Sequence, residues 1–140
     1  MDKFCSKCAV DPASHSFRKI SEKNGYCVFY TNPSKAKDKD TESILNHFNL
    51  ALEKVGNKRW IWVFDGDGFE TEHALEIRTG QGLSALINDK YGNNLDEIKI
   101  INPTVHIKLA LKVMGPFMSD LLKSKIKILD DRVYSVLEFM

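Results

Sequence analysis

The sequence predicts an α/β fold in which helices flank a mostly parallel sheet, with a β-hairpin at the N-terminal end. Two short β-type runs, at residues 98–101 and 125–129, enclose one helix-length segment at about 105–114. Strand, helix, strand is the order from which a parallel sheet is built. The run at 60–64, WIWVF, is apolar without alternation, which indicates a strand covered on both faces. Strands and helices alternate from residue 41 onward, as they do in α/β proteins.

The length and composition indicate one soluble globular domain. The chain has 140 residues, of which 43% are apolar and 28% charged, and no linker divides it. Its net charge of +1 argues against a nucleic-acid-binding protein that depends on bulk electrostatics. No apolar run approaches the roughly 18 residues of a membrane-spanning helix, and the start of the chain lacks the apolar core of a signal peptide. We therefore expect a cytoplasmic protein.

The N-terminal hairpin is predicted from two β-rich runs, at 16–20 and 26–31. Between them lies Asn24-Gly25, a pair that favours a tight turn because both residues tolerate positive φ. The charged stretch that follows, 32–40, is expected to be a solvated and mobile loop.

Two amphipathic helices are predicted in the middle of the chain. Apolar residues recur at intervals of three and four over 41–55, which gives one apolar face. The second helix spans about 74–90, where Gly80 and Gly82 are expected to mark a kink or a break. A final amphipathic segment, 133–139, closes the chain.

The three cysteines form an odd set, which fits a reducing compartment better than a disulfide framework. Cys5 and Cys8 have the spacing of half a zinc-binding motif, and only Cys27 or His15 could complete the four ligands of a structural site. Because neither comes in a second paired motif, the sequence favours ordinary thiols in an N-terminal strand or loop. No metal site is predicted.

The sharpest chemical motif is DGDG at 65–68, directly after the apolar strand. It resembles the opening motif of the haloacid-dehalogenase-like phosphatases, and Asp130-Asp131 resembles their terminal acidic motif. That resemblance implies a nucleophile at Asp65, a general acid/base at Asp67 and a magnesium ion that neutralises the phosphate. The position of the motif far inside the chain, and Phe69 after it, depart from the phosphatase pattern.

Several further landmarks follow the same strand in a fixed order. They are an Asp-x-x-Gly turn, a tyrosine at the end of a helix, a strand that ends in Asn-Pro, a Pro-Phe pair and a Lys-Ile strand: Asp65 to Gly68, Tyr91, Asn102-Pro103, Pro116-Phe117 and Lys125-Ile126. In this order and spacing they resemble the CRAL-TRIO lipid-binding domain. The resemblance implies a single CRAL-TRIO-like domain over 16–140, after an N-terminal segment, 1–15. It also implies that Asp65 and the glycines shape a turn and take no part in catalysis.

The resemblance implies that the protein binds, and as a carrier transfers, one hydrophobic small molecule or phospholipid, without enzymatic activity and without a cofactor. The ligand would lie in an apolar cavity between the sheet and a mobile gate at 107–118, where methionines adapt to varied ligands. Matching positions give the expected ligand-binding residues: Trp62, Phe64, Ile98, Ile100 and Ile126 on the sheet floor, Leu109, Val113, Met114, Phe117 and Met118 in the gate, and Lys125, which matches a lysine of the family.

The chain also departs from the family, and two other functions stay open. Tyr91 is followed by Gly92-Asn93 where phosphoinositide-binding members have Pro-Glu, so Lys125 lacks an acidic partner. The first alternative is a non-catalytic protein-interaction module on the same fold, as in some divergent members, and the second is the magnesium-dependent phosphatase. Lysines that would contact an anionic membrane surface or an acidic protein partner, or else form a solvated face, are Lys99, Lys108, Lys112, Lys123 and Lys127.

Overall fold

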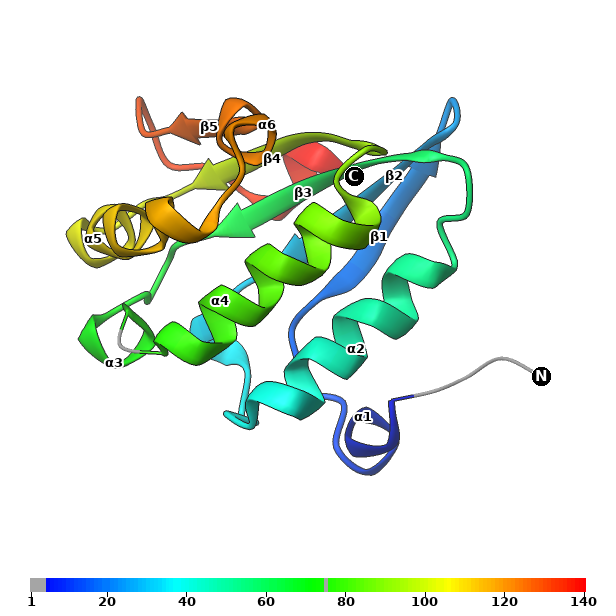
Figure 1. Cartoon of the computed structure of the whole chain (residues 1–140), viewed down its shortest axis with the longest axis horizontal. Coiled ribbons are helices and arrows are strands. Elements are labelled where there is room, and N and C mark those ends of the chain that lie inside the picture. Colours follow the sequence, from blue (N-terminus) through cyan, green and yellow to red (C-terminus); the bar gives the residue numbers. More distant parts are fainter. Residues whose placement is uncertain (1–4, 75) are drawn as a thin grey trace.

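A five-stranded mixed sheet forms the centre of the computed structural model, which describes residues 5–74 and 76–140 (Figure 1). The strand order follows the sequence, β1-β2-β3-β4-β5. β1 and β2 are antiparallel, and every later pair is parallel. The predicted α/β class and the N-terminal hairpin are confirmed. The strands are β1 Arg18–Lys23, β2 Tyr26–Thr31, β3 Arg59–Asp65, β4 Leu95–Ile101 and β5 Ile126–Leu129.

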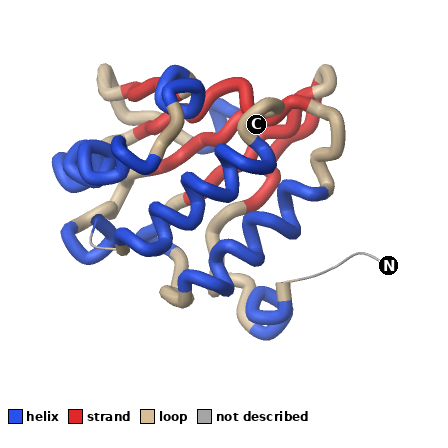
Figure 2. Tube along the Cα trace, in the orientation of Figure 1, coloured by secondary structure: helices blue, strands red, loops and turns tan. Residues whose placement is uncertain are grey.

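Helices α2 to α6 lie in the connections between successive parallel strands. Such connections are right-handed as a rule, and here each one advances by one strand in the same direction, so these connecting helices gather on one face (Figure 2). Among the described residues no helix has both the length and the hydropathy needed to cross a bilayer. The helical elements are α1 Ser6–Val10, η1 Pro33–Lys35, α2 Thr41–Glu53, α3 Thr71–Ala74, α4 Ile77–Leu86, the π-helical turn η2 Ile87–Tyr91, α5 Val105–Met114, η3 Gly115–Phe117, α6 Asp120–Ser124 and η4 Val136–Phe139.

The C-terminal segment covers the opposite face of the sheet. Tyr30, Val63 and Ile101 are buried there, with Tyr134 and Phe139 packed against them. On β3 the side chains alternate between this small cluster and the main core on the helix side. Both faces of β3 are therefore covered, as its unbroken apolar run predicts.

The hairpin turn lies where the sequence places it, with positive φ at Asn24 (54°) and Gly25 (80°). The first strand, however, begins later than predicted and extends to Lys23. Ser16 lies outside the strand ladder because its hydroxyl accepts a hydrogen bond from the Asn32 backbone amide (3.2 Å) and bonds the Thr31 hydroxyl (2.7 Å). Side-chain bonds thus replace backbone pairing at this end of the hairpin.

The charged stretch 32–40 is not simply a solvated loop. Asn32 is buried, and its side chain caps the 3₁₀ turn Pro33–Lys35. Farther along, the backbone amide of Asp38 donates to the carbonyl of Ser14 at 2.9 Å. The loop is therefore attached to the N-terminal segment, which the structure describes from Cys5 onward.

The helix predicted over 74–90 is divided, but not at its glycines. Residue 75 lies outside the described residues, and α4 runs without interruption across Gly80 and Gly82. A Cβ on Gly80 would lie 2.6 Å from Sδ of Met114, and one on Gly82 would lie 2.6 Å from Cδ1 of Leu45. The glycines therefore serve close packing of α4 against α5 and α2, which the breaker interpretation missed.

Candidate functional site

An apolar cavity lies between the sheet and helices α4 and α5, and three strands form its floor. Because side chains alternate along a strand, Trp62 and Phe64 of β3 point to the helix face together with Ile98 and Ile100 of β4 and Ile126 of β5. The strand register pairs Trp62 with Ile98, Phe64 with Ile100, and Ile98 with Ile126. These five side chains, all predicted for the floor, form one continuous apolar surface.

Helix α5 forms one wall through a single stripe of side chains. Ile107, Ala110, Leu111 and Met114 recur at helical spacing and all line the cavity. The helix begins at Thr104, whose hydroxyl accepts from the Ile107 amide at 3.3 Å and donates to the Phe69 carbonyl at 2.7 Å. This cap fixes the first turn of α5 to the segment that follows β3.

Helix α4 forms the facing wall with the same spacing. Gly80, Leu83, Ser84 and Ile87, the last in the π-helical turn, line the cavity. The Ser84 hydroxyl donates to the Gly80 carbonyl at 2.9 Å, so this polar group is satisfied within the helix. Sequence reasoning missed the α4 wall, although the apolar stripe of that segment is readable from the printed sequence.

The cavity has a volume of about 190 Å³ and an almost wholly apolar lining. The polar residues at its border already have partners. The Thr79 hydroxyl bonds that of Thr41 at 2.9 Å, and the Glu76 carboxylate lies 3.6 Å from the Lys39 ammonium. Trp62 Nε1 on the floor is a buried donor with no hydrogen-bond partner among the described residues. The site therefore offers shape and apolar contact, with little to hold a charged group.

The predicted gate residues divide into two groups. Met114 and Met118 line the cavity, whereas Leu109, Val113 and Phe117 do not. These last three are 55%, 40% and 48% exposed. At 100° per residue, positions 109 and 113 lie on the side of α5 opposite the cavity stripe, so the helix cannot direct both sets inward. That they contact a ligand stays a prediction.

Lys125 also lies outside the cavity lining. It precedes β5, and its ammonium donates to the carbonyl of Gly92. Burial lowers the pKa of this lysine below its usual value, with the Arg59 charge acting in the same direction. Lys125 therefore holds the end of the π-helical turn against the start of β5.

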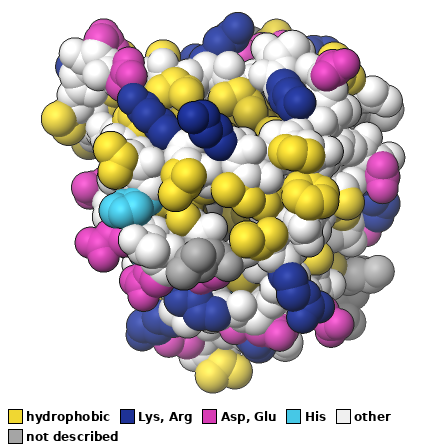
Figure 3. All heavy atoms as spheres, turned by 60° about the vertical axis from the view of Figure 1, so that its left-hand side comes forward, with side chains coloured by type: hydrophobic (Ala, Val, Ile, Leu, Met, Phe, Trp, Pro, Cys, Tyr) yellow, Lys and Arg dark blue, Asp and Glu magenta, His cyan; other side chains and the backbone are white. Residues whose placement is uncertain are grey.

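Exposed apolar side chains gather on the outer surface of the same elements. Figure 3 brings the side with α3 and α5 forward and shows hydrophobic side chains on this face, interspersed with Lys or Arg. The exposed members on α5, η3 and α6 are Val105, Leu109, Val113, Phe117 and Leu121. We refer to these five residues as the outer apolar face.

The DGDG motif forms a structural turn around a buried carboxylate. Asp65 is 7% exposed and accepts hydrogen bonds from the Tyr30 hydroxyl (2.6 Å), the Asn102 side-chain amide (3.1 Å) and the Asp67 backbone amide (3.0 Å). Burial, with the Asp65 carboxylate beside it, raises the pKa of Tyr30 to about 12. Gly68 has φ of 80°, a conformation that favours glycine. Asp65 thus links β2, β3 and the end of β4.

This arrangement bears on the phosphatase alternative. The Asp65 carboxylate is occupied by three donors, and Asp67 is exposed. Asp130 lies at the surface, 3.4 Å from the Lys108 ammonium. Among the residues that the structure describes, these carboxylates do not form a group of three that could hold a metal ion. The geometry therefore favours a structural role for the motif.

Comparison with known proteins agrees with the fold. The sequence model of a family described as the CRAL/TRIO domain matches residues 16–140. A solved structure entitled "Crystal structure of Sfh5" superposes with a TM-score of 0.68 at 12% sequence identity. The match covers 88% of this chain and 51% of that one, so the chain spans about half the length of the structure that it matches. At this identity the likeness shows the fold alone.

Proposed function

The chain belongs to the CRAL/TRIO domain family, and from this premise we propose that it binds one hydrophobic small molecule or lipid chain in the cavity between the sheet and helices α4 and α5. The observation that carries the proposal is an apolar cavity of about 190 Å³, partly open to solvent, in the main core on the helix side of the sheet. Protein interiors leave few voids larger than a water molecule, and an apolar cavity of about 150 Å³ stays dry and binds small apolar molecules.

The cavity volume limits what fits without movement. Pockets for drug-sized ligands measure about 300–1,000 Å³, so about 190 Å³ suits one slender chain or one small ring. Met114 and Met118 line the side toward η3, and their unbranched side chains can change rotamer at low cost. We propose that a longer ligand enters by displacing these methionines together with η3.

Selectivity would follow from the lining. Thr79 and Glu76 at the border already bond Thr41 and Lys39. Lys125 bonds a backbone carbonyl instead of facing the cavity. Burying the surface of an uncharged or long-chain apolar ligand contributes about 25 cal/mol of binding free energy per Å². An unpaired charge inside the cavity would instead lose its hydration, which is unfavourable. The site therefore suits the apolar chain of a ligand better than a charged head group.

Transfer would require contact with a membrane surface, and the outer apolar face supplies one candidate. Leu109, Val113 and Phe117 are exposed on the elements whose inner side lines the cavity. Lys108 and Lys112 lie on the same helix and would favour anionic lipid. The same face also supports the alternative of a non-catalytic protein-interaction module, because contiguous exposed apolar surface marks interaction sites of either kind.

Native mass spectrometry of the purified protein, followed by organic extraction, tests the proposal. Binding predicts a hydrophobic molecule in a one-to-one complex. A folded protein that carries nothing and takes up no lipid from phosphatidylcholine vesicles would favour the interaction module. The phosphatase alternative predicts magnesium-dependent turnover of a generic phosphate ester, and we propose that the protein has no such activity.

A further inference from the structure

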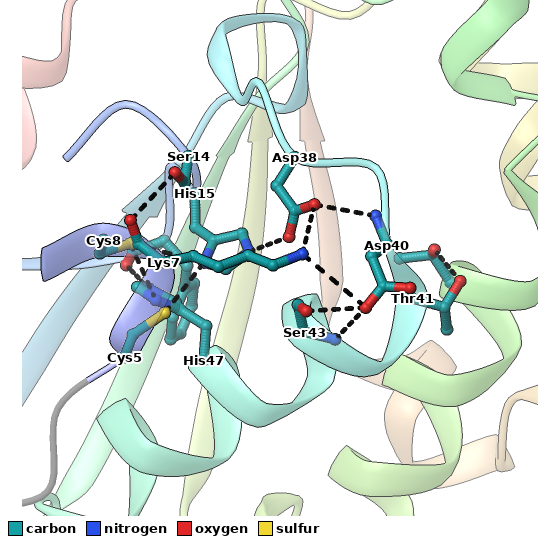
Figure 4. Close-up of polar contacts among 12 residues, drawn as sticks. Cys5, Lys7, Cys8, Ser14, His15, Asp38, Asp40, Thr41, Ser43 and His47 are labelled. Atoms are coloured by element: carbon teal, nitrogen blue, oxygen red, sulfur yellow. Dashed lines mark hydrogen bonds and ion pairs between the residues drawn. The ribbon is translucent and has the colours of Figure 1, made fainter. Parts of the chain in front are cut away.

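Four potential metal ligands from three separate segments converge at the N-terminal end of the fold (Figure 4). Cys5 and Cys8 come from α1 and its N-cap, His15 precedes β1, and His47 lies in α2. One ligand atom from each of the four lies within 4.8 Å of the others. The sequence shows only the Cys-x-x-Cys half of this set, because His47 reaches it through the packing of α2.

The distances match the coordination sphere of zinc. Sγ of Cys5 and Sγ of Cys8 lie 3.3 and 3.4 Å from Nδ1 of His15, and Sγ of Cys8 lies 3.5 Å from Nδ1 of His47. A tetrahedral zinc ion with Zn–S of about 2.3 Å and Zn–N of about 2.0 Å holds sulfur and nitrogen about 3.5 Å apart. A modest outward movement of the ligand atoms would admit the ion at their centre.

The outer nitrogen of each imidazole is held by an oxygen acceptor. His47 Nε2 lies 2.6 Å from the backbone carbonyl of Phe17, which can only accept, so this nitrogen carries the proton. His15 Nε2 lies 2.7 Å from a carboxylate oxygen of Asp38. With Nε2 bonded outward in this way, each ring directs Nδ1 toward the cysteine sulfurs. Metal-binding histidines have this arrangement, with the other ring nitrogen bonded to a carboxylate or a backbone carbonyl.

The surroundings fix these partners in place. Lys7 pairs with Asp38 at 3.0 Å, and the Ser14 hydroxyl donates to the Lys7 carbonyl. The His15 side chain is only 2% exposed. A shallow recess lined in part by Cys5, Cys8 and His47 leaves a route from solvent for an ion. The cluster is thus preorganised and accessible.

Helix α1 contributes no buried side chain to the core, and Lys7 attaches it to Asp38 near the surface. It has five residues, and none of them is buried. A helix this short is not stable by itself in water, because the conformational entropy lost in forming its first turn exceeds the stabilisation from the few hydrogen bonds that form. A metal ion bridging Cys5 and Cys8 to His47 would attach α1 to α2 and to the segment before the hairpin.

We propose that Cys5, Cys8, His15 and His47 bind one Zn²⁺ ion in a structural site. Thiolate and imidazole ligands select zinc over magnesium and calcium, which prefer oxygen. Four protein ligands fill a tetrahedral sphere and leave no open position for a substrate, so the site is structural. It lies apart from the lipid cavity, with which it shares no lining residue.

The test measures metal content in the full-length chain, purified after expression with added zinc and stripped of any affinity tag. The expected result is one equivalent of zinc per chain after gel filtration. Replacement by Co²⁺ should give the intense visible bands of a tetrahedral ion and a thiolate-to-metal charge-transfer band. Cys8→Ser should lose the metal and the charge-transfer intensity, whereas the control Cys27→Ser, which removes a buried thiol outside the cluster, should retain both.

A second variant distinguishes loss of zinc binding from loss of folding. Cys5 is partly exposed at the N-cap of α1, so Cys5→Ser should keep the far-ultraviolet circular dichroism of the fold while losing zinc. Wild-type protein without metal, or an equal zinc content in wild type and both cluster variants, would overturn the proposal. So would a Co²⁺ spectrum without thiolate charge transfer, since that would place the ion elsewhere.

Discussion

Filling the cavity should abolish ligand binding without harming the fold, and Ala110→Leu is the most direct way to fill it. Ala110 lies on the α5 stripe that lines the cavity, so the added side chain points into empty space. Removing the whole void of about 190 Å³ would stabilise the protein by at most about 4.6 kcal/mol, at about 24 cal/mol per Å³. Three added carbon atoms, at about 0.8 kcal/mol each, set a closer limit of about 2.4 kcal/mol.

We therefore expect the free energy of unfolding of Ala110→Leu to equal or exceed that of wild type, measured by urea denaturation of lipid-free protein. Affinity for cis-parinaric acid, followed by its fluorescence increase, should fall at least about tenfold, which corresponds to about 1.4 kcal/mol. The matched control is Val113→Leu, which enlarges an exposed side chain on the opposite side of α5 and should leave affinity unchanged.

Two results would refute this reasoning. If Ala110→Leu destabilised the protein by about 1–3 kcal/mol, the site would already be filled, because overpacking has that cost. If the variant were stable and bound the probe as tightly as wild type, the ligand would lie elsewhere.

Three further predictions concern the frame around the cavity. The pKa of Tyr30 is raised from about 10 to about 12 in the folded protein, so the protonated tyrosine stabilises the fold fully below pH 10. This stabilisation is lost as the pH rises from 10 to 12. In Tyr30→Phe, the free energy of unfolding should therefore lack this fall between pH 10 and 12. Asp65→Asn should lower the free energy of unfolding by about 1–3 kcal/mol, because it weakens a buried set of three hydrogen bonds. The control Asp67→Asn, at an exposed position, should change this free energy little. Equal losses of stability in the two variants would contradict a structural role for the Asp65 carboxylate. Gly82→Val should destabilise by about 1–3 kcal/mol in thermal or urea unfolding, because its Cβ would lie 2.6 Å from Leu45, and an unchanged stability would show that α2 and α4 are not in close contact there.

The strands were predictable because each corresponds to a short run of β-type residues in the sequence. The apolar run at 60–64 became β3, the run at 98–101 became the end of β4, and the helix expected at 105–114 is α5. The floor residues were predicted from matching positions in the family that the sequence resembles, and the alternation of side chains along these strands turns them toward the helices. Composition and periodicity are properties of short segments, so they predict where individual strands and helices lie in the sequence.

The walls of the cavity were predicted less completely because α5 is apolar on more than one side. Leu109 and Val113 are as hydrophobic as Ile107 and Leu111, so counting apolar residues does not identify the inner face. Packing against β3 and β4 selects it. On α4, Gly80 was interpreted as a helix breaker, whereas its lack of a side chain makes room for Met114.

The histidine and cysteine cluster shows the same limit more sharply. Cys5, Cys8 and His15 are close in sequence, but His47 joins them only because α2 packs against Phe17, just before β1, and the Phe17 carbonyl holds its ring. That contact depends on the tertiary arrangement of hairpin and helix. No local pattern in the sequence specifies it.

The most direct test of the central claim uses Trp62 on the cavity floor as a reporter. Trp60→Phe leaves it as the single tryptophan of the chain. Addition of a dibrominated stearic acid, whose bromine atoms quench only at close range, should reduce its emission to a saturating level at one equivalent, whereas unbrominated stearic acid should not. Emission that stays unchanged at saturating brominated acid, or changes equally with both acids, would contradict binding of an apolar chain in this cavity.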